Sequence, residues 1–216
     1  MSKAISNKNV MKATFETVNF EGRWLACIGR PELRGAWFVW GGSGSGKTTF
    51  VLQLCKYLTK FGRVAYNSLE QGLSLSMQTA WGRVKMEEAG NNIILLNRET
   101  LAEIRKRLHK RNAPRVMVID SLMCLTGFNR NVYSSLLAEF PNTLFIFICH
   151  EKNGKPDPAV GESVRRLADV KIFVEGYVAY PTTRYENEQT GEGGAEFVIW
   201  EKGANAFRAK VSANKQ

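Results

Sequence analysis

Long apolar runs are missing from this 216-residue sequence. No window approaches the roughly 18 uncharged apolar residues of a membrane-spanning helix. The polar start, MSKAISNKNVMK, also lacks the apolar centre of a secretory signal peptide. These absences argue against a membrane-spanning or secreted protein, so we expect a cytoplasmic location and no membrane partner.

Histidine and cysteine are also scarce. The two histidines are too few and too far apart for a metal cluster, and no cysteines have the C-x₂-C spacing of zinc and redox sites. All four cysteines stand among apolar residues: Cys27, Cys55, Cys124 and Cys149. We therefore expect reduced side chains in the core rather than ligands.

Apolar and basic residues are abundant. Hydrophobic residues make up 44% of the chain, enough for one α/β domain with its own core. The formal net charge of +10 favours a polyanionic partner such as nucleic acid. The densest basic stretch, residues 105–111, lies in a helix-like segment whose apolar residues keep three-to-four spacing. We interpret its charges as a solvated helix face, with a DNA-binding patch as the alternative.

The stretch VWGGSGSGKTT separates an apolar run, residues 36–40, from an apolar helix-like run, residues 50–54. A flexible linker seldom interrupts a core strand and its following helix. The spacing Gly, four residues, Gly-Lys-Thr is instead that of a phosphate-binding loop, whose backbone N–H groups surround phosphate oxygens. The predicted nucleotide contacts are Gly41, Gly42, Ser43, Gly44, Ser45, Gly46, Lys47, Thr48 and Thr49.

Each residue type in this loop has a chemical role. We expect Lys47 to reach the β- and γ-phosphates of ATP and the Thr48 hydroxyl to coordinate Mg²⁺. A second metal-binding acid is expected at the end of an apolar strand, and VMVID supplies Asp120 there. Glu70 follows another strand, where a carboxylate could activate the water that attacks the γ-phosphate.

Strand and helix patterns alternate along the chain. Helices are predicted over residues 47–60, 73–89 with an interruption near Gly82, 99–112 and 133–140. Strands are predicted over residues 63–67, 92–96, 116–119, 143–149, 171–174, 177–180, 196–200 and 208–211. Residues 151–163 should form a mobile loop, 164–168 a short helix at most and 187–194 a hairpin-like tip. This order predicts an α/β fold with a mostly parallel sheet that ends in antiparallel strands.

The order GGSGSGKTT, NSLEQ, VMVIDSL, FIFICHEKNGKP and VRRLADVKIFVEG resembles the RecA-like P-loop ATPases. Within them it is most similar to the ATPase core of the RadA/Sms and DnaB-type branch. The first motif is common to all P-loop proteins, whereas the order of the other four is more specific. The resemblance suggests an ATPase core over residues 33–205, an N-terminal segment 1–32 for oligomerisation or packing, and a tail over 206–216.

The resemblance implies further roles. Glu70 would be the catalytic base and His150 the sensor of the γ-phosphate, although a strand-end histidine with a purely structural role is the alternative. Residues 126–131, with Arg130, and residues 151–163, with Lys152 and Lys155, would line a DNA channel. Self-association into a ring or filament is also implied.

The sequence departs from this branch in two ways. It has no evident zinc module, protease-like tail or helicase-type N-terminal domain, so it resembles small phage-encoded recombination and annealing proteins. The Lys-Asn-Arg-Phe-Gly signature is replaced by TTRYE, which keeps Arg184 as a candidate for a charge donated to a neighbouring subunit.

These observations predict an ATPase that depends on Mg²⁺ and acts on DNA, preferentially single-stranded, in recombination, repair or replication. Two alternatives remain open. One is an ATP-gated regulatory or assembly protein that does not use DNA. The other is a small-molecule kinase, which would need an acceptor pocket in place of Glu70 and a water.

Overall fold

The computed structural model describes residues 4–157 and 159–213. Residues 1–3, 158 and 214–216, which belong to the predicted N-terminal segment, loop and tail, lie outside the described part. The strands are β1 (Gly35–Gly41), β2 (Val64–Ser68), β3 (Ile93–Asn97), β4 (Val116–Asp120), β5 (Leu144–Lys152), β6 (Lys155–Asp157), β7 (Val170–Glu175), β8 (Val178–Thr183) and β9 (Phe197–Val198). The helices are α1 (Asn7–Lys12), α2 (Gly22–Ile28), α3 (Lys47–Leu58), α4 (Leu75–Arg83), α5 (Leu101–Leu108), α6 (Arg130–Glu139), α7 (Ala159–Leu167) and α8 (Glu201–Ala213), with 3₁₀ turns η1 (Met86–Asn92) and η2 (Leu122–Cys124).

The strands form one sheet in the order β3-β2-β4-β5-β1-β7-β8-β9, and β6 pairs with the end of β5. The six strands from β3 to β7 in this order are parallel. Strands β6, β8 and β9 are antiparallel to their neighbours. The prediction of a mostly parallel sheet finished by antiparallel strands is confirmed.

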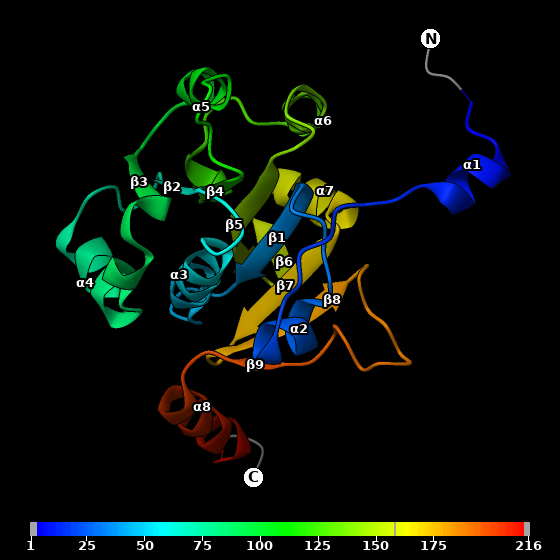
Figure 1. The fold of residues 1–216 in the computed structure, drawn as a ribbon. Helices are drawn as coiled ribbons and strands as arrows, with labels where there is room; N and C mark the ends of the chain where they lie inside the picture. Colours follow the sequence, from blue (N-terminus) through cyan, green and yellow to red (C-terminus); the bar gives the residue numbers. More distant parts are fainter. Residues whose placement is uncertain (1–3, 158, 214–216) are drawn as a thin grey trace.

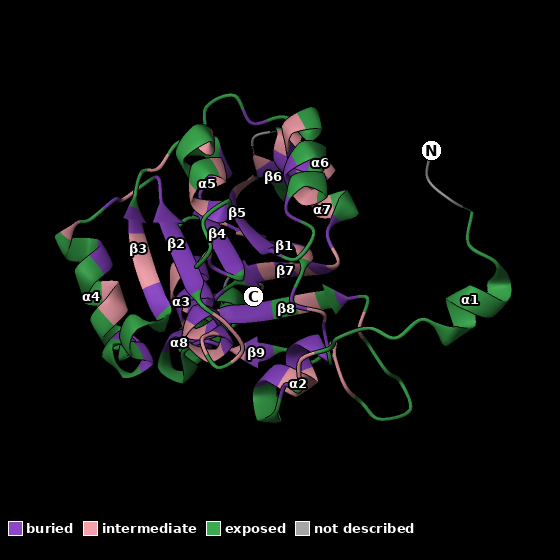
Figure 2. Cartoon of the chain, turned by 45° about the horizontal axis from the view of Figure 1, so that its top comes forward, coloured by how far each residue is buried: buried purple, intermediate pink, exposed green. Residues whose placement is uncertain are grey.

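The central strand β1 shows why the sheet is buried on both faces (Figure 2). Its alternate residues enter two cores: Trp37 and Val39 pack with α2, α3 and α4, while Ala36 and Phe38 pack with α5, α6 and α7. Fully burying a side chain of this size is worth about 1.5–3 kcal/mol. The continuous apolar run is therefore what two covered faces require.

The segment before β1 has two parts. Residues of α2, including Trp24 and Cys27, pack into the core. Helix α1 instead extends away from the body (Figure 1), and none of its residues is buried. The bounds of the three predicted segments remain a prediction, and α8 runs across the proposed boundary at residue 205.

Residues 151–163 were predicted to be a loop, and this is wrong. Strand β5 continues to Lys152 and turns back into β6, and α7 begins at Ala159 rather than near residue 164. The turn is Asn153-Gly154, and both residues have positive φ, 54° and 76°. Asn-Gly is the preferred pair for a two-residue hairpin turn of this kind, so the sequence did contain the signal.

Two further predictions are wrong. Residues 208–211 lie in α8 rather than a strand, because Ala204, Phe207 and Val211 recur at three-to-four spacing over a longer window than four residues. Cys124 is exposed at the end of η2, whereas the other three cysteines are buried as expected. The interruption of the helix near Gly82 is confirmed, since α4 ends at Arg83 and η1 follows.

Candidate functional site

The loop between β1 and α3 has the geometry of a phosphate-binding loop. Strand β1 ends at Gly41 and α3 begins at Lys47. At Gly41 an added Cβ would lie 2.0 Å from the carbonyl oxygen of Val174, so no side chain fits there. Gly46 caps the helix with φ 105° and ψ 5°, a left-handed conformation that glycine adopts without strain. The glycines at both ends of the loop therefore follow from the backbone geometry.

The Lys47 ammonium lies within this loop. Its Nζ donates hydrogen bonds to the carbonyl oxygens of Gly41, at 2.9 Å, and Gly42, at 2.7 Å. Burial lowers the pKa of Lys47, while the negative charges of Asp120 and Glu70 act in the opposite direction. A partly desolvated cation is thus held at the amino end of α3, where the helix dipole also favours an anion.

Asp120 ends β4 and is 5% exposed. The Tyr66 hydroxyl on the neighbouring strand β2 donates a hydrogen bond to its Oδ2. Burial raises the pKa of Asp120 to about 6, while the bond from Tyr66 and the positive charge of Lys47 lower it. Next to this carboxylate, the buried hydroxyls of Ser68 and Ser121 have no hydrogen-bond partner in the described part of the chain.

These side chains fit a magnesium ion. Thr48 and Asp120 offer the hard oxygen ligands that Mg²⁺ prefers, and the unpartnered serine hydroxyls show that polar groups are available around Asp120. Within residues 4–157 and 159–213, no group of three or more His, Cys, Asp or Glu side chains could hold a metal ion. Mg²⁺ commonly takes one or two carboxylates and completes its shell with water and substrate phosphates, so such a group is not needed.

Glu70 and His150 contact each other, although 80 residues separate them in the sequence. Glu70 Oε2 lies 2.9 Å from His150 Nε2. The backbone N–H of Glu70 also donates to the carbonyl oxygen of Asp120, at 3.2 Å. His150 pairs with Gly41 in the register of β5 and β1. The structure therefore brings Glu70, His150, Asp120 and the phosphate-binding loop to one edge of the sheet.

Arg184 lies at the opposite edge. It follows β8, which runs antiparallel to β7 and whose last residue, Thr183, pairs with Val170 at the start of β7. The Arg184 side chain is 62% exposed, and its Nη1 lies 3.2 Å from Asp169 Oδ1. From this position it cannot contact the phosphate-binding loop of its own chain.

The predicted DNA-binding residues are on the surface. Arg130 is the first residue of α6, which follows the loop after β4. Lys152 and Lys155 are paired across the tip of the β5–β6 hairpin. All three are exposed, and the hairpin continues directly from His150 at the nucleotide edge.

Sequence reasoning missed three residues around the site. Tyr66 contacts Asp120, as described above, and its signal was a hydroxyl in a strand buried on both faces. Glu151 contributes a negative charge near Lys47. Tyr177 has φ 63°, unusual for a residue with a side chain, and its N–H donates to the carbonyl oxygen of Ser45 at 3.0 Å. Nothing in the local sequence indicated that Tyr177 supports the loop.

Comparisons with known proteins agree with the fold. The flagellar accessory protein FlaH from Methanocaldococcus jannaschii aligns with a TM-score of 0.53 and 14% identity, covering 71% of this chain and 79% of that one. The ATPase domain of a DnaB-like helicase aligns with a TM-score of 0.51 and 16% identity, covering 78% and 82%. The KaiC-like protein PH0186 from Pyrococcus horikoshii OT3 aligns with a TM-score of 0.55 and 17% identity, covering 77% and 84%.

The chain has a RecA-like P-loop fold. At these identities the likeness establishes the fold, and it does not single out the RadA and DnaB branch. No family model and no curated protein matches the sequence. None of the helices in the described part of the chain is long and apolar enough to cross a bilayer.

Proposed function

We propose that this protein is an ATPase that depends on Mg²⁺. The observation that carries the proposal is the convergence of four elements at one sheet edge: the phosphate-binding loop, Asp120 at the end of β4, Glu70 after β2 and His150 on β5. In open α/β sheets, ligands bind at the carboxyl ends of parallel strands. A phosphate-binding loop with two acids at that edge supports phosphoryl transfer from ATP.

Each side chain has a distinct task in this proposal. Lys47 neutralises the terminal phosphates from within the loop, and Glu70 orients the attacking water and accepts its proton. Mg²⁺, held by Thr48 and Asp120 when bound, supplies charge neutralisation at the transferred phosphoryl group. His150 contacts Glu70 in this structure, so it is placed to hold that carboxylate and to register what occupies the edge.

We further propose that the protein acts on single-stranded DNA in recombination, repair or replication. Lys152 and Lys155 stand at the tip of a hairpin that begins at His150, so one strand links the nucleotide edge to exposed positive charges. A contact made only in the ATP state would shift the hairpin toward one arrangement. Arg130 adds a third exposed charge after β4. Binding would use phosphates and show little base preference.

Self-association is part of the proposal. Arg184 lies at the edge opposite its own nucleotide site, so a role at a γ-phosphate requires a neighbouring subunit. The apolar side chains of the N-terminal arm support such contacts. Val10, Met11 and Phe15 are 55%, 79% and 62% exposed, and large exposed apolar groups commonly mark interaction surfaces.

An ATP-gated assembly protein that does not use DNA is the second candidate. The exposed apolar arm favours it directly, and one protein of similar fold is a flagellar accessory protein. A small-molecule kinase is less well supported, because Glu70 occupies the position of a water-activating carboxylate. Release of inorganic phosphate without any added acceptor would exclude the kinase.

The test is phosphate release from ATP and Mg²⁺, measured with and without single-stranded DNA, alongside the mass in solution with and without ATP. DNA stimulation supports the DNA-dependent ATPase. ATP-dependent assembly with no response to DNA supports the second candidate instead.

The decisive variant is Glu70→Gln, which removes the proton acceptor and keeps the shape of the side chain. We expect ATP binding to persist and hydrolysis to fall by roughly 10²-fold or more. Glu188→Gln, at the exposed 187–194 tip, is the control for loss of one carboxylate. Normal hydrolysis by Glu70→Gln would place the base elsewhere and refute the assignment of Glu70.

A further inference from the structure

A dense group of cations lies at the edge of the sheet opposite the nucleotide site. We define it as the back-edge patch, formed by Arg63, Lys106, Lys110, Arg111 and Arg115. All five residues are exposed. They number half of the formal net charge of +10, so the positive excess of the chain is concentrated here.

The sheet register explains how distant residues meet in the patch. Arg63 and Arg115 directly precede β2 and β4, which pair in parallel from Val64 and Val116. The carbonyl oxygen of Arg63 accepts hydrogen bonds from the N–H groups of Arg115, at 2.9 Å, and Val116, at 3.1 Å. Helix α5 runs back along the sheet and ends at Leu108, which delivers the remaining lysines and Arg111 to the same edge.

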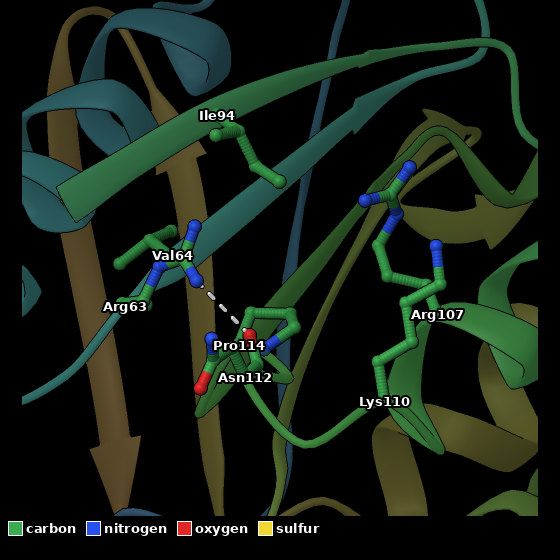
Figure 3. Close-up of a pocket in the computed structure, with 7 residues that line it drawn as sticks. All are labelled: Arg63, Val64, Ile94, Arg107, Lys110, Asn112 and Pro114. Atoms are coloured by element: carbon green, nitrogen blue, oxygen red, sulfur yellow. Dashed lines mark hydrogen bonds between the residues drawn. The ribbon is translucent and has the colours of Figure 1, made fainter. Parts of the chain in front are cut away.

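A cavity of about 200 Å³ opens within the patch, several times the ~30 Å³ that one water occupies in the liquid. Figure 3 shows Arg107 and Lys110 on one side of it and Arg63 on the other. The Arg63 Nη1 donates to the carbonyl oxygen of Asn112, at 3.0 Å, which holds its guanidinium in place. The cavity is therefore lined by cations from two separate parts of the chain.

Nearby acids do not neutralise these charges. Glu99 is paired with Arg107, and Glu139 lies beside Arg105 and His109. Glu103 accepts from Thr100 in the capping box that starts α5. In the described part of the chain, no residue of the back-edge patch has an ion-pair partner. The acids of this region thus serve other groups and leave the patch as a region of uncompensated positive charge.

We propose that the back-edge patch binds the phosphate backbone of nucleic acid, independently of ATP. Several exposed cations around a small cavity match a ligand with closely spaced negative charges. No large exposed apolar side chain among the described residues lies at positions 61–64 or 105–115, so the patch lacks the insertion groups of a membrane-binding surface. This replaces the earlier interpretation of the basic stretch 105–111 as a solvated helix face only.

The patch is separate from the proposed nucleotide site. Strands β2 and β4 begin at the patch and end at Ser68 and Asp120, five residues later. At about 3.3 Å per residue they span roughly 15 Å. The proposal therefore goes beyond the ATPase and does not depend on it.

The test uses a labelled 30-nucleotide oligo(dT) and a 30-base-pair duplex, without nucleotide, over about 50–200 mM salt. The variant Lys106→Gln, Lys110→Gln, Arg111→Gln removes three phosphate contacts. For the single strand we expect the slope of log K against log salt to fall by about 2, at about 0.7 for each contact. We expect affinity to fall at least tenfold. A second variant, Arg63→Gln with Arg115→Gln, approaches the cavity from the strand side and should lower the slope by about 1.4.

The control Lys12→Gln, Lys202→Gln, Lys210→Gln removes three exposed lysines elsewhere and should keep the parental slope. Thermal melting of every variant verifies folding. Slopes equal to that of the control in both patch variants would overturn the proposal. So would an unchanged affinity for nucleic acid together with lost binding to poly-glutamate or to phosphatidylserine vesicles. Because no ATP is present, a failed ATPase assignment would leave these results unaffected.

Discussion

At the scale of single residues, Lys47 is the clearest case of a side chain whose environment suits one task. It is buried, its ammonium is held by two loop carbonyl oxygens, and burial lowers its pKa. Keeping a cation in this state costs free energy of solvation that an exposed lysine does not lose. A bound phosphate chain would supply the missing counter-charge.

We therefore expect Lys47→Ala to lose productive ATP binding while the protein still folds. The melting temperature should change by only a few degrees, because a change of 1 kcal/mol shifts it by about 2–4 °C in a chain of this size. Calorimetric titration with ATP and Mg²⁺, alongside thermal melting, measures both. Lys202→Ala is the matched control on exposed α8. Parental ATP affinity and turnover in Lys47→Ala would refute the phosphate-binding role.

At the scale of elements, β5 is the strand that joins the two proposed activities. It crosses the centre of the sheet beside β1, carries His150 at the nucleotide edge and continues as the hairpin with Lys152 and Lys155. Gly161 of α7 packs so closely on the hairpin that an added Cβ would lie 2.7 Å from Cys149 Sγ. The hairpin is thus supported by packing rather than being a free loop.

Two substitutions separate the ends of this element. His150→Ala should leave ATP binding nearly intact but remove the dependence of DNA affinity on ATP, because the contact that distinguishes the two states is lost. Fluorescence anisotropy with oligo(dT), with and without a non-hydrolysable ATP analogue, measures the coupling. Unchanged coupling in His150→Ala would show that the histidine has only a structural role.

Lys152→Ala with Lys155→Ala removes the charges at the tip. We expect weaker binding to oligo(dT) in the presence of ATP and a salt slope smaller by about 1.4, from two contacts at about 0.7 each. The paired control is Lys202→Ala with Lys210→Ala on α8. If the tip variant binds as its control does, the hairpin is not the DNA site and the back-edge patch would be the better candidate.

At the scale of the whole molecule, the opposite positions of Arg184 and the phosphate-binding loop matter most. One chain cannot join them, whereas an assembly that places the amino edge of one subunit against the carboxyl edge of the next would. The pairing of Arg184 with Asp169 is exposed and therefore weak, of the order that surface ion pairs contribute, about 0–1 kcal/mol. The arginine is thus available to a partner.

Mixing two inactive proteins tests this arrangement. Arg184→Ala lacks the donated charge and Glu70→Gln lacks the base, so only mixed assemblies would contain sites with both groups intact. We expect phosphate release to recover partly in mixtures and to be greatest near equal ratios. Glu70→Gln mixed with Lys47→Ala is the control, since both substitutions fall at the same proposed site. No recovery at any ratio, with mixed assembly verified by mass, would argue against a shared site.

The sequence by itself determined the features that neighbouring residues encode. The phosphate-binding loop, the apolar strand ending at Asp120 and the mostly parallel sheet all follow from contiguous patterns, because backbone geometry and burial act over a few residues. The places where local reasoning failed were also short: a four-residue window concealed the helical spacing of α8, and the Asn-Gly turn in residues 151–163 was overlooked.

Only the tertiary structure decided which distant residues meet. The strand order β3-β2-β4-β5-β1-β7 places the ends of β2, β4 and β5 side by side, so Glu70 reaches His150 and Tyr66 reaches Asp120. The same order gathers the back-edge patch at the opposite edge and reverses β8 so that Arg184 points away from its own loop. The physical reason is that crossover connections set strand order through the packing of whole helices against the sheet, which no local pattern records.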